Sequence, residues 1–215
     1  MIAALFAMDN PMSSPLDSDY PRRGNAFSRW LASGFLRLAG WRVTNPMPAV
    51  PKAVIIGGPH TSNWDGIYTL AAMMQLGLDA HVMIKDSAFK GPFGAMLRWM
   101  GALPIARHKA GGVVEQTVAQ FNSREKLVMV VAPEGTRGGA TQWKTGFYRI
   151  AEQAGVPIVL ATADYRKKEI TFARVIEPCG DVEKDLAEIF ECYASIHPRH
   201  PDKLSAPLKA LRERR

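Results

Sequence analysis

The chain has 215 residues, 47% of them hydrophobic, and a formal net charge of +7 at pH 7. This length and apolar content fit one globular domain with a sizeable core, and no Ser/Gly-rich linker divides the chain. The positive charge favours nucleic acid, anionic lipid or acidic metabolites as partners. The sequence has no RNA-binding aromatic motif, zinc-finger spacing or basic-zipper pattern. These common nucleic-acid-binding classes are therefore excluded, and a membrane surface is the expected partner.

Several features of the sequence predict where the protein works. No segment reaches the ~20 apolar residues that a membrane-spanning helix needs. The stretch Met1–Met8 lacks the basic start and the cleavage site of a signal peptide. Cys179 and Cys192 have no metal-binding or redox spacing, so both are expected to be reduced thiols. We therefore expect a cytoplasmic protein that binds the cytoplasmic membrane face peripherally.

The first part of the chain combines an irregular segment with a helical pattern. Residues 9–25 are rich in Pro, Ser, Asp and Gly, so residues 1–25 are predicted to form an irregular arm. Over residues 27–40, apolar residues recur at three- and four-residue steps, which predicts an amphipathic helix. Its Trp and Arg residues suit a membrane interface, where aromatic rings lie at headgroup depth. An ordinary helix packed on the core explains the same pattern equally well.

The middle of the chain alternates between apolar runs and helical patterns. Short or β-branched apolar runs predict buried strands at 53–56, 80–84, 102–105, 127–131 and 158–163. Helical patterns lie at 64–76, 93–100, 112–121 and 146–154, followed by an edge strand at 170–176 and a helix at 182–193. This alternation predicts an α/β fold, with one domain over 26–196 whose central, largely parallel mixed sheet is flanked by helices. Residues 197–215 contain prolines and are then basic, which predicts a tail.

The spacing His-x4-Asp occurs three times, at His60/Asp65, His81/Asp86 and His197/Asp202. The second pair flanks a predicted strand, where an odd separation puts the side chains on opposite faces and about 17 Å apart. The third pair lies in a segment with two prolines, which predicts an exposed link and a solvated pair. Neither is expected to form a catalytic site.

His60 has a different setting, because it follows a strand and a Gly-Gly-Pro turn and precedes a helical pattern. With Asp65 one turn into that helix, its carboxylate can fold back onto Nδ1 of His60. The other nitrogen, Nε2, then faces out at the carboxyl end of a strand, where open α/β sheets place ligands. A carboxylate on one nitrogen fixes the tautomer and stabilises the imidazolium. His60 is therefore predicted to be a general base that activates an alcohol, although the motif alone also fits a histidine that only packs near a helix start.

A second segment, Pro133-Glu134-Gly135-Thr136-Arg137, leaves the carboxyl end of the strand at 127–131. Arg137 offers a planar fork for phosphate oxygens. Thr136 and the flexible backbone at Gly135 can add donors to the same anion. Glu134 cannot bind phosphate, and its expected task is to position Arg137 or an acceptor hydroxyl. Taken alone, this segment also fits a polar surface loop.

Two more cations are predicted at the same rim of the sheet. Lys85 ends one predicted strand, and Arg107 follows the next one along the chain. Because the carboxyl ends of parallel strands share an edge, both are expected near His60 and Glu134.

These motifs together resemble the glycerolipid acyltransferases, the family that includes lysophosphatidic acid acyltransferase. The matching segments are His60 with Asp65, then Lys85 with Pro92-Phe93-Gly94 and residues 101–107, then Pro133 to Arg137 with the later Lys144-Thr145-Gly146, and finally Val156-Pro157-Ile158-Val159. Their order and spacing agree over about residues 54–162.

The resemblance implies an O-acyltransferase with a glycerol-3-phosphate acyltransferase-like fold. It implies catalysis by His60 with Asp65, and phosphate contacts from Arg137 and Arg107. The acceptor would be a lysophospholipid, 1-acylglycerol-3-phosphate, and the acyl thioester of coenzyme A or acyl carrier protein would be a co-substrate rather than a bound cofactor. No metal is implied.

Other interpretations remain open. An acyltransferase of the same mechanism could act on another lysolipid, such as an amino-acid-containing lipid. A metal-dependent hydrolase could use His60, Asp65 and Glu134 as ligands. A non-catalytic protein could bind lipid surfaces through residues 27–41 and its basic ends. Acyl chain length and donor type are not indicated by the residues.

Overall fold

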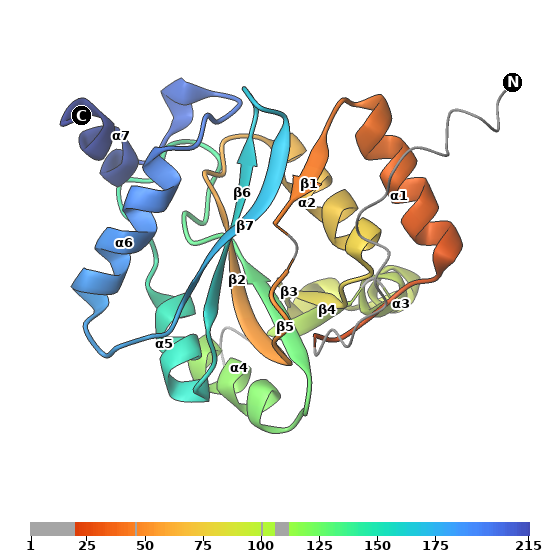
Figure 1. Cartoon of the computed structure of the whole chain (residues 1–215). Coiled ribbons are helices and arrows are strands. Elements are labelled where there is room, and N and C mark those ends of the chain that lie inside the picture. Colours follow the sequence, from red (N-terminus) through yellow and green to blue (C-terminus); the bar gives the residue numbers. More distant parts are fainter. Residues whose placement is uncertain (1–19, 46, 100, 106–111) are drawn as a thin grey trace, which may run out of the picture.

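The computed structural model describes residues 20–215 except 46, 100 and 106–111 (Figure 1). Its centre is a seven-stranded sheet with the order β1-β7-β6-β2-β5-β3-β4. Neighbouring strands are parallel except for β6 and β7, which are antiparallel. The predicted single α/β domain with a largely parallel mixed sheet is confirmed. The strands are β1 (Arg42–Thr44), β2 (Lys52–Gly58), β3 (Ala80–Lys85), β4 (Ala102–Ile105), β5 (Leu127–Val131), β6 (Ile158–Asp164) and β7 (Glu169–Ile176).

Helices cover both faces of this sheet (Figure 1). The core on one face is formed with α4 (Gly112–Asn122), α5 (Gly146–Ala154), α6 (Val182–Ala194) and α7 (Ala206–Glu213). The other face is covered by α1 (Ala26–Leu38) and α2 (Asn63–Leu76), while α3 (Gly91–Trp99) packs near β4. Two 3-10 turns, η2 (Asp86–Ala88) and η3 (Pro201–Lys203), complete the described elements. In the part of the chain that the structure describes, no helix is long and apolar enough to span a membrane.

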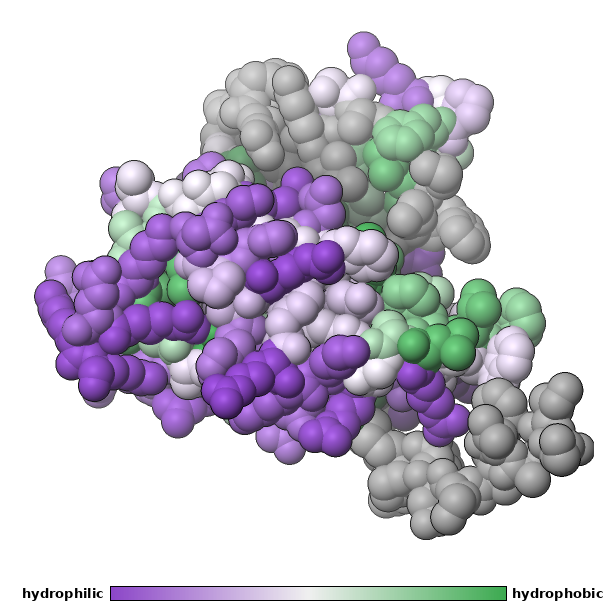
Figure 2. Space-filling view, turned by 90° about the horizontal axis from the view of Figure 1, so that it is seen from above, coloured by the Kyte–Doolittle hydropathy of each residue, from purple (hydrophilic) through white to green (hydrophobic). Residues whose placement is uncertain are grey.

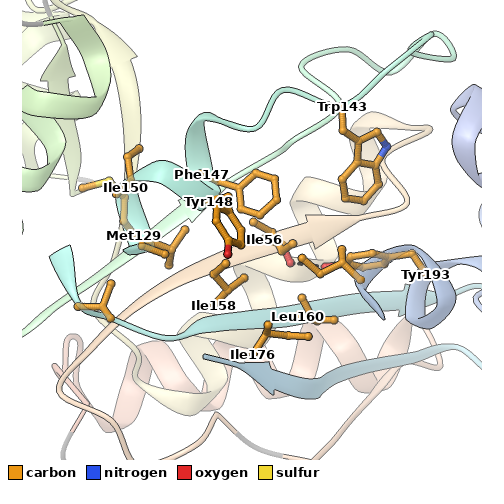
Figure 3. Close-up of a cluster of buried hydrophobic side chains, with 14 of the residues drawn as sticks. Ile56, Met129, Trp143, Phe147, Tyr148, Ile150, Ile158, Leu160, Ile176 and Tyr193 are labelled. Carbon is orange, nitrogen blue, oxygen red and sulfur yellow. Dashed lines mark hydrogen bonds between the residues drawn. The ribbon is translucent and has the colours of Figure 1, made fainter. Parts of the chain in front are cut away.

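Strand β2 lies at the centre of the sheet and is buried on both faces. Val54 and Ile56 point into the core formed with α5 and α6, and Ala53 and Ile55 point into the opposite core. A strand covered on both faces has a continuous run of apolar residues, and this run allowed β2 to be predicted from the sequence. Figure 3 shows the first core, in which the Tyr193 hydroxyl donates a hydrogen bond to the Ile56 carbonyl at 2.6 Å. The catalytic histidine candidate therefore follows a strand that is enclosed on both faces.

The strand at 170–176 is not at the edge of the sheet, so that prediction was wrong. Strand β7 lies between β6 and β1, and β1 occupies the edge. The sequence analysis missed β1 because it has only three residues. Its pairing with β7 includes a hydrogen bond from Arg42 Nε to Glu169 Oε1 at 2.8 Å.

The C-terminal residues, predicted as a tail, contribute a helix and part of the core. Leu208 of α7 is fully buried, and Arg212 donates hydrogen bonds to the carbonyls of Ala194 and Ile196. Ser205 accepts a hydrogen bond from Trp143 Nε1 at 2.9 Å, which ties this segment to the loop that follows β5. The segment is therefore fixed against the edge of the sheet that carries the candidate site.

Candidate active site

His60 stands in the turn between β2 and α2. The helix begins with a capping box, in which Ser62 Oγ accepts from the backbone N–H of Trp64 and the Asp65 carboxylate accepts from the backbone N–H of Ser62. This local chemistry explains why Asp65 points back toward the turn, since a carboxylate at the third helical position satisfies free amides of the helix start. The cap that fixes the helix start therefore also brings Asp65 to His60.

The His60 and Asp65 side chains meet as the spacing predicts. Nδ1 of His60 lies 3.4 Å from Oδ2 of Asp65, and the two side chains are only 17% and 7% exposed. Burial raises the pKa of Asp65, but hydrogen bonds from His60, Tyr165 and the amides of Ser62 and Thr61 outweigh it, and the pKa lies below its ordinary value. Asp65 is therefore an anion that can stabilise a protonated imidazole.

Glu134 reaches the same site from the end of β5. Its Oε1 accepts a hydrogen bond from the backbone N–H of His60 at 3.2 Å, so it holds the main chain of the base. Its other oxygen, Oε2, is buried and has no hydrogen-bond partner in the described structure. Burial raises the pKa of Glu134 to about 7, although the backbone N–H and the charge of His60 act to lower it. The carboxyl group thus titrates near neutral pH.

Arg137 lies on the opposite side of the imidazole from Asp65. Its Nε donates to Nε2 of His60 at 3.3 Å. The ring is therefore held between a carboxylate and a guanidinium. The arginine thus occupies the nitrogen of His60 that does not face Asp65.

The loop around Arg137 opens onto a hollow of about 620 Å³, lined by residues 134–136 and 140–145. Gly135 has a φ of +65°, and a Cβ at this position would lie 3.2 Å from Nζ of Lys144. The ammonium of Lys144 therefore lies against the loop, on the side of the hollow. Thr136 Oγ1 accepts from the N–H of Gly138 at 3.2 Å, which fixes the turn. Lys144 was not among the predicted site residues.

The two other predicted cations are described incompletely. Lys85 is the last residue of β3 and lies at the expected edge of the sheet, but its side chain is outside the described part of the structure. Arg107 falls within residues 106–111, outside the described residues.

The remaining histidines make other contacts. His81 lies with Nδ1 at 2.7 Å from the Gly101 carbonyl and Nε2 at 3.6 Å from Asp79. His197, predicted to form a solvated pair in an exposed link, instead lies 3.5 Å from Asp164 at the end of β6. The predicted partner was therefore wrong, although the His197 side chain is half-exposed as predicted.

This C-terminal segment supplies contacts that the sequence analysis missed. The N–H of His200 donates to Thr61 Oγ1 at 3.3 Å, one residue from His60. The guanidinium of Arg199 lies 5.5 Å from the ring centre of Trp64 and 5.9 Å from that of Tyr165. Tyr165 in turn donates its hydroxyl hydrogen to Oδ1 of Asp65 at 2.6 Å.

Among the described residues, no group of three or more His, Cys, Asp or Glu side chains is arranged as a metal site. Both oxygens of Asp65 accept hydrogen bonds from protein donors. Its lone pairs are therefore directed to His60, to backbone amides and to Tyr165.

Comparisons with known proteins identify the family and the fold. No curated protein matches the chain significantly. Among solved structures, the chain is similar to the crystal structure of the 1-acyl-sn-glycerophosphate (LPA) acyltransferase, PlsC, from Thermotoga maritima, at 14% identity and a TM-score of 0.56, over 78% of this chain and 75% of that one. The profile of the family described as Acyltransferase matches residues 41–162, which include His60, Asp65 and the Glu134–Arg137 loop. Since this match spans more than half of the sequence, the chain belongs to the acyltransferase family.

Proposed function

We propose that this protein is an O-acyltransferase that moves a fatty acyl group from an acyl thioester to the hydroxyl of a lysophospholipid, with 1-acylglycerol-3-phosphate as the acceptor. The donor is the thioester of coenzyme A or acyl carrier protein. One observation carries this proposal, namely the position of the His60 ring between Asp65, 3.4 Å from Nδ1, and Arg137, 3.3 Å from Nε2. A base and an anion-binding group are thereby adjacent.

The proposed reaction needs one base and no covalent enzyme intermediate. Nε2 of His60 takes the proton of the acceptor hydroxyl as its oxygen attacks the thioester carbonyl carbon. The carbon–sulfur bond of the tetrahedral intermediate then breaks, and the thiolate leaves. The imidazolium of His60, stabilised by Asp65, returns the proton to the thiolate. The products are a diacyl lipid and a free thiol.

Two cations at the loop support an acceptor that carries a phosphate. Arg137 provides a planar donor fork, and Lys144 lies against Gly135 beside the hollow. When the acceptor phosphate binds the guanidinium of Arg137, this group leaves Nε2 of His60. The acceptor hydroxyl can then reach the base. Binding of the correct headgroup would therefore also expose Nε2 of His60 to the acceptor hydroxyl.

A peripheral membrane position is supported by an apolar surface on α1 and α2. Leu38 is 92% exposed and Trp30 is 58% exposed, although both are large apolar side chains. The other exposed apolar residues of these helices are Phe27, Leu31, Phe35, Trp64, Ile67, Leu70 and Met74. Figure 2 shows hydrophobic colour gathered over the α1 side of the molecule. We name the nine residues of this paragraph the apolar patch, and propose that it enters the interface of the anionic cytoplasmic membrane face.

The apolar patch reaches the catalytic residues, because Trp64 directly precedes Asp65 in α2. A lysophospholipid can thus present its headgroup to the site while its acyl chain stays in the membrane. Arg29 and Arg37 of α1 are exposed among these apolar residues and suit contacts with lipid phosphates.

A thiol-release assay tests the function directly. The purified protein is given acyl-coenzyme A, or acyl carrier protein thioester, with a panel of lysolipids in mixed vesicles. We expect thiol release that depends on lysophosphatidic acid and yields phosphatidic acid. Release without any acceptor would instead indicate a thioesterase. If no member of the panel gains an acyl group with either donor, the proposed function is wrong.

A further inference from the structure

We propose that Tyr165 is a positioning residue for the His60–Asp65 pair and acts through the Asp65 carboxylate. This inference rests on the proposed function, in which His60 is the base. Tyr165 directly follows β6, so its backbone lies at the same edge of the sheet as the end of β2. Its hydroxyl reaches Asp65 across 100 residues of sequence, at 2.6 Å from Oδ1.

The two oxygens of Asp65 have different partners. Oδ2 accepts from the backbone N–H groups of Thr61 and Ser62, both at 2.7 Å, and lies 3.4 Å from Nδ1 of His60. Oδ1 accepts from Tyr165, its only donor among the residues that the structure describes. Since Asp65 is buried, loss of this donor would leave Oδ1 unpaired and free the carboxylate to rotate away from His60.

Tyr165 is itself held by its surroundings. Its backbone N–H donates to the His197 carbonyl at 2.9 Å, and its ring packs edge-on against Trp41 at 4.9 Å between ring centres. The Arg199 guanidinium lies over the same ring, 5.9 Å from its centre. The C-terminal segment therefore fixes the position from which the hydroxyl reaches Asp65.

The hydroxyl of Tyr165 acts as a donor rather than as a second base. Burial, together with the hydrogen bond to Asp65 and its charge, raises the pKa of Tyr165 well above its ordinary value. It therefore keeps its proton at neutral pH, and it orients Asp65 without exchanging a proton with substrate.

The kinetic test compares Tyr165→Phe with Tyr68→Phe. Tyr68 belongs to the same aromatic cluster, with its ring 4.4 Å from Trp41, so its variant is a matched control for the loss of a hydroxyl. We expect Tyr165→Phe to lower kcat by about tenfold or more, the size of one lost hydrogen bond to a charged group, with little change in either KM. Tyr68→Phe should leave kcat unchanged. A normal kcat in Tyr165→Phe would overturn the proposal.

A double-mutant cycle with Asp65→Asn shows whether Tyr165 acts through Asp65. We expect the effect of Tyr165→Phe to shrink strongly once Asp65 is replaced, because the two changes then disrupt the same interaction. An equal fall in kcat in both backgrounds would mean that Tyr165 acts elsewhere, and the proposal would fail. Circular dichroism and melting temperature establish that each variant is folded.

A labelling experiment needs no substrate and so separates this inference from the proposed function. Diethyl pyrocarbonate modifies neutral imidazole, and the tryptic peptide 53–85 contains both His60 and His81. Without the Tyr165 hydroxyl, the Asp65 carboxylate can turn away from His60 and protonated His60 loses its partner, so the midpoint of its labelling should move to lower pH by roughly 0.5. His81 is the internal control and should not change. An unmoved His60 midpoint would refute the positioning role, whether or not the wild-type protein transfers acyl groups.

Discussion

Replacing Glu134 by glutamine is expected to make the protein steadily more stable relative to the wild type as the pH rises from about 4 to about 8. Glu134 is 3% exposed, and burial raises its pKa from 4.5 to about 7 in the folded protein. Between these values the folded protein holds a proton that the unfolded chain has lost, so the free energy of unfolding falls as the pH rises. At about 1.4 kcal/mol for each pKa unit, the whole loss is about 3 kcal/mol. Glutamine does not titrate and escapes this loss.

Urea unfolding, followed by circular dichroism at several pH values, measures the effect. The difference in the free energy of unfolding between Glu134→Gln and the wild type should be smallest near about pH 4 and grow by about 3 kcal/mol toward about pH 8. Burying the glutamine amide lowers the free energy of unfolding by the same amount at every pH. It therefore shifts the plot of this difference against pH without changing its slope. A difference that does not vary with pH would refute the reasoning that burial keeps Glu134 protonated near neutrality.

Three further changes test the proposed function. His60→Ala removes the base and should lower turnover by about 10²–10⁴-fold at an unchanged melting temperature; a variant that keeps most of its thiol-release activity would contradict the mechanism. Arg137→Ala should raise the acceptor KM more than it lowers kcat, whereas an unchanged acceptor KM would argue against a phosphate contact. Leu38→Asp places a charge in the apolar patch and should weaken sedimentation with anionic vesicles. Ala187→Asp on α6 adds the same charge on an exposed position outside the patch, and equal losses in the two variants would rule out docking through α1.

The centre of the fold could be predicted because its strands are short apolar runs buried on both faces. The predicted bounds of β4, β5 and α5 match the structure to the residue. Strand β1 could not be predicted, since its three residues show no apolar pattern. It exists as a strand through its pairing with β7, in which Arg42 and Glu169 lie 127 residues apart. Such pairing depends on the assembled sheet.

The candidate site could be predicted in part for a physical reason. His60, Asp65, Glu134 and Arg137 lie in loops that follow β2 and β5, and neighbouring parallel strands deliver such loops to one edge. The same rule selects Tyr165 once it is applied to β6, although Tyr165 belongs to no motif. The contacts of the C-terminal segment could not be predicted, because no local sequence pattern shows which part of the fold a chain packs against after its last predicted helix.

The two parts of the candidate site, His60 and the loop at 135–138, differ in how firmly the fold holds them. The proposed base follows β2, which is enclosed by neighbours on both faces and both edges, whereas residues 135–138 of the proposed anion-binding loop are exposed and include two glycines. Substitutions in this loop can therefore alter which headgroup is held while the geometry of the base stays as it is. Because the two parts are held separately, relatives can keep the same reaction while they change the acceptor. Sequence variation among relatives is therefore expected in the loop rather than at the end of β2.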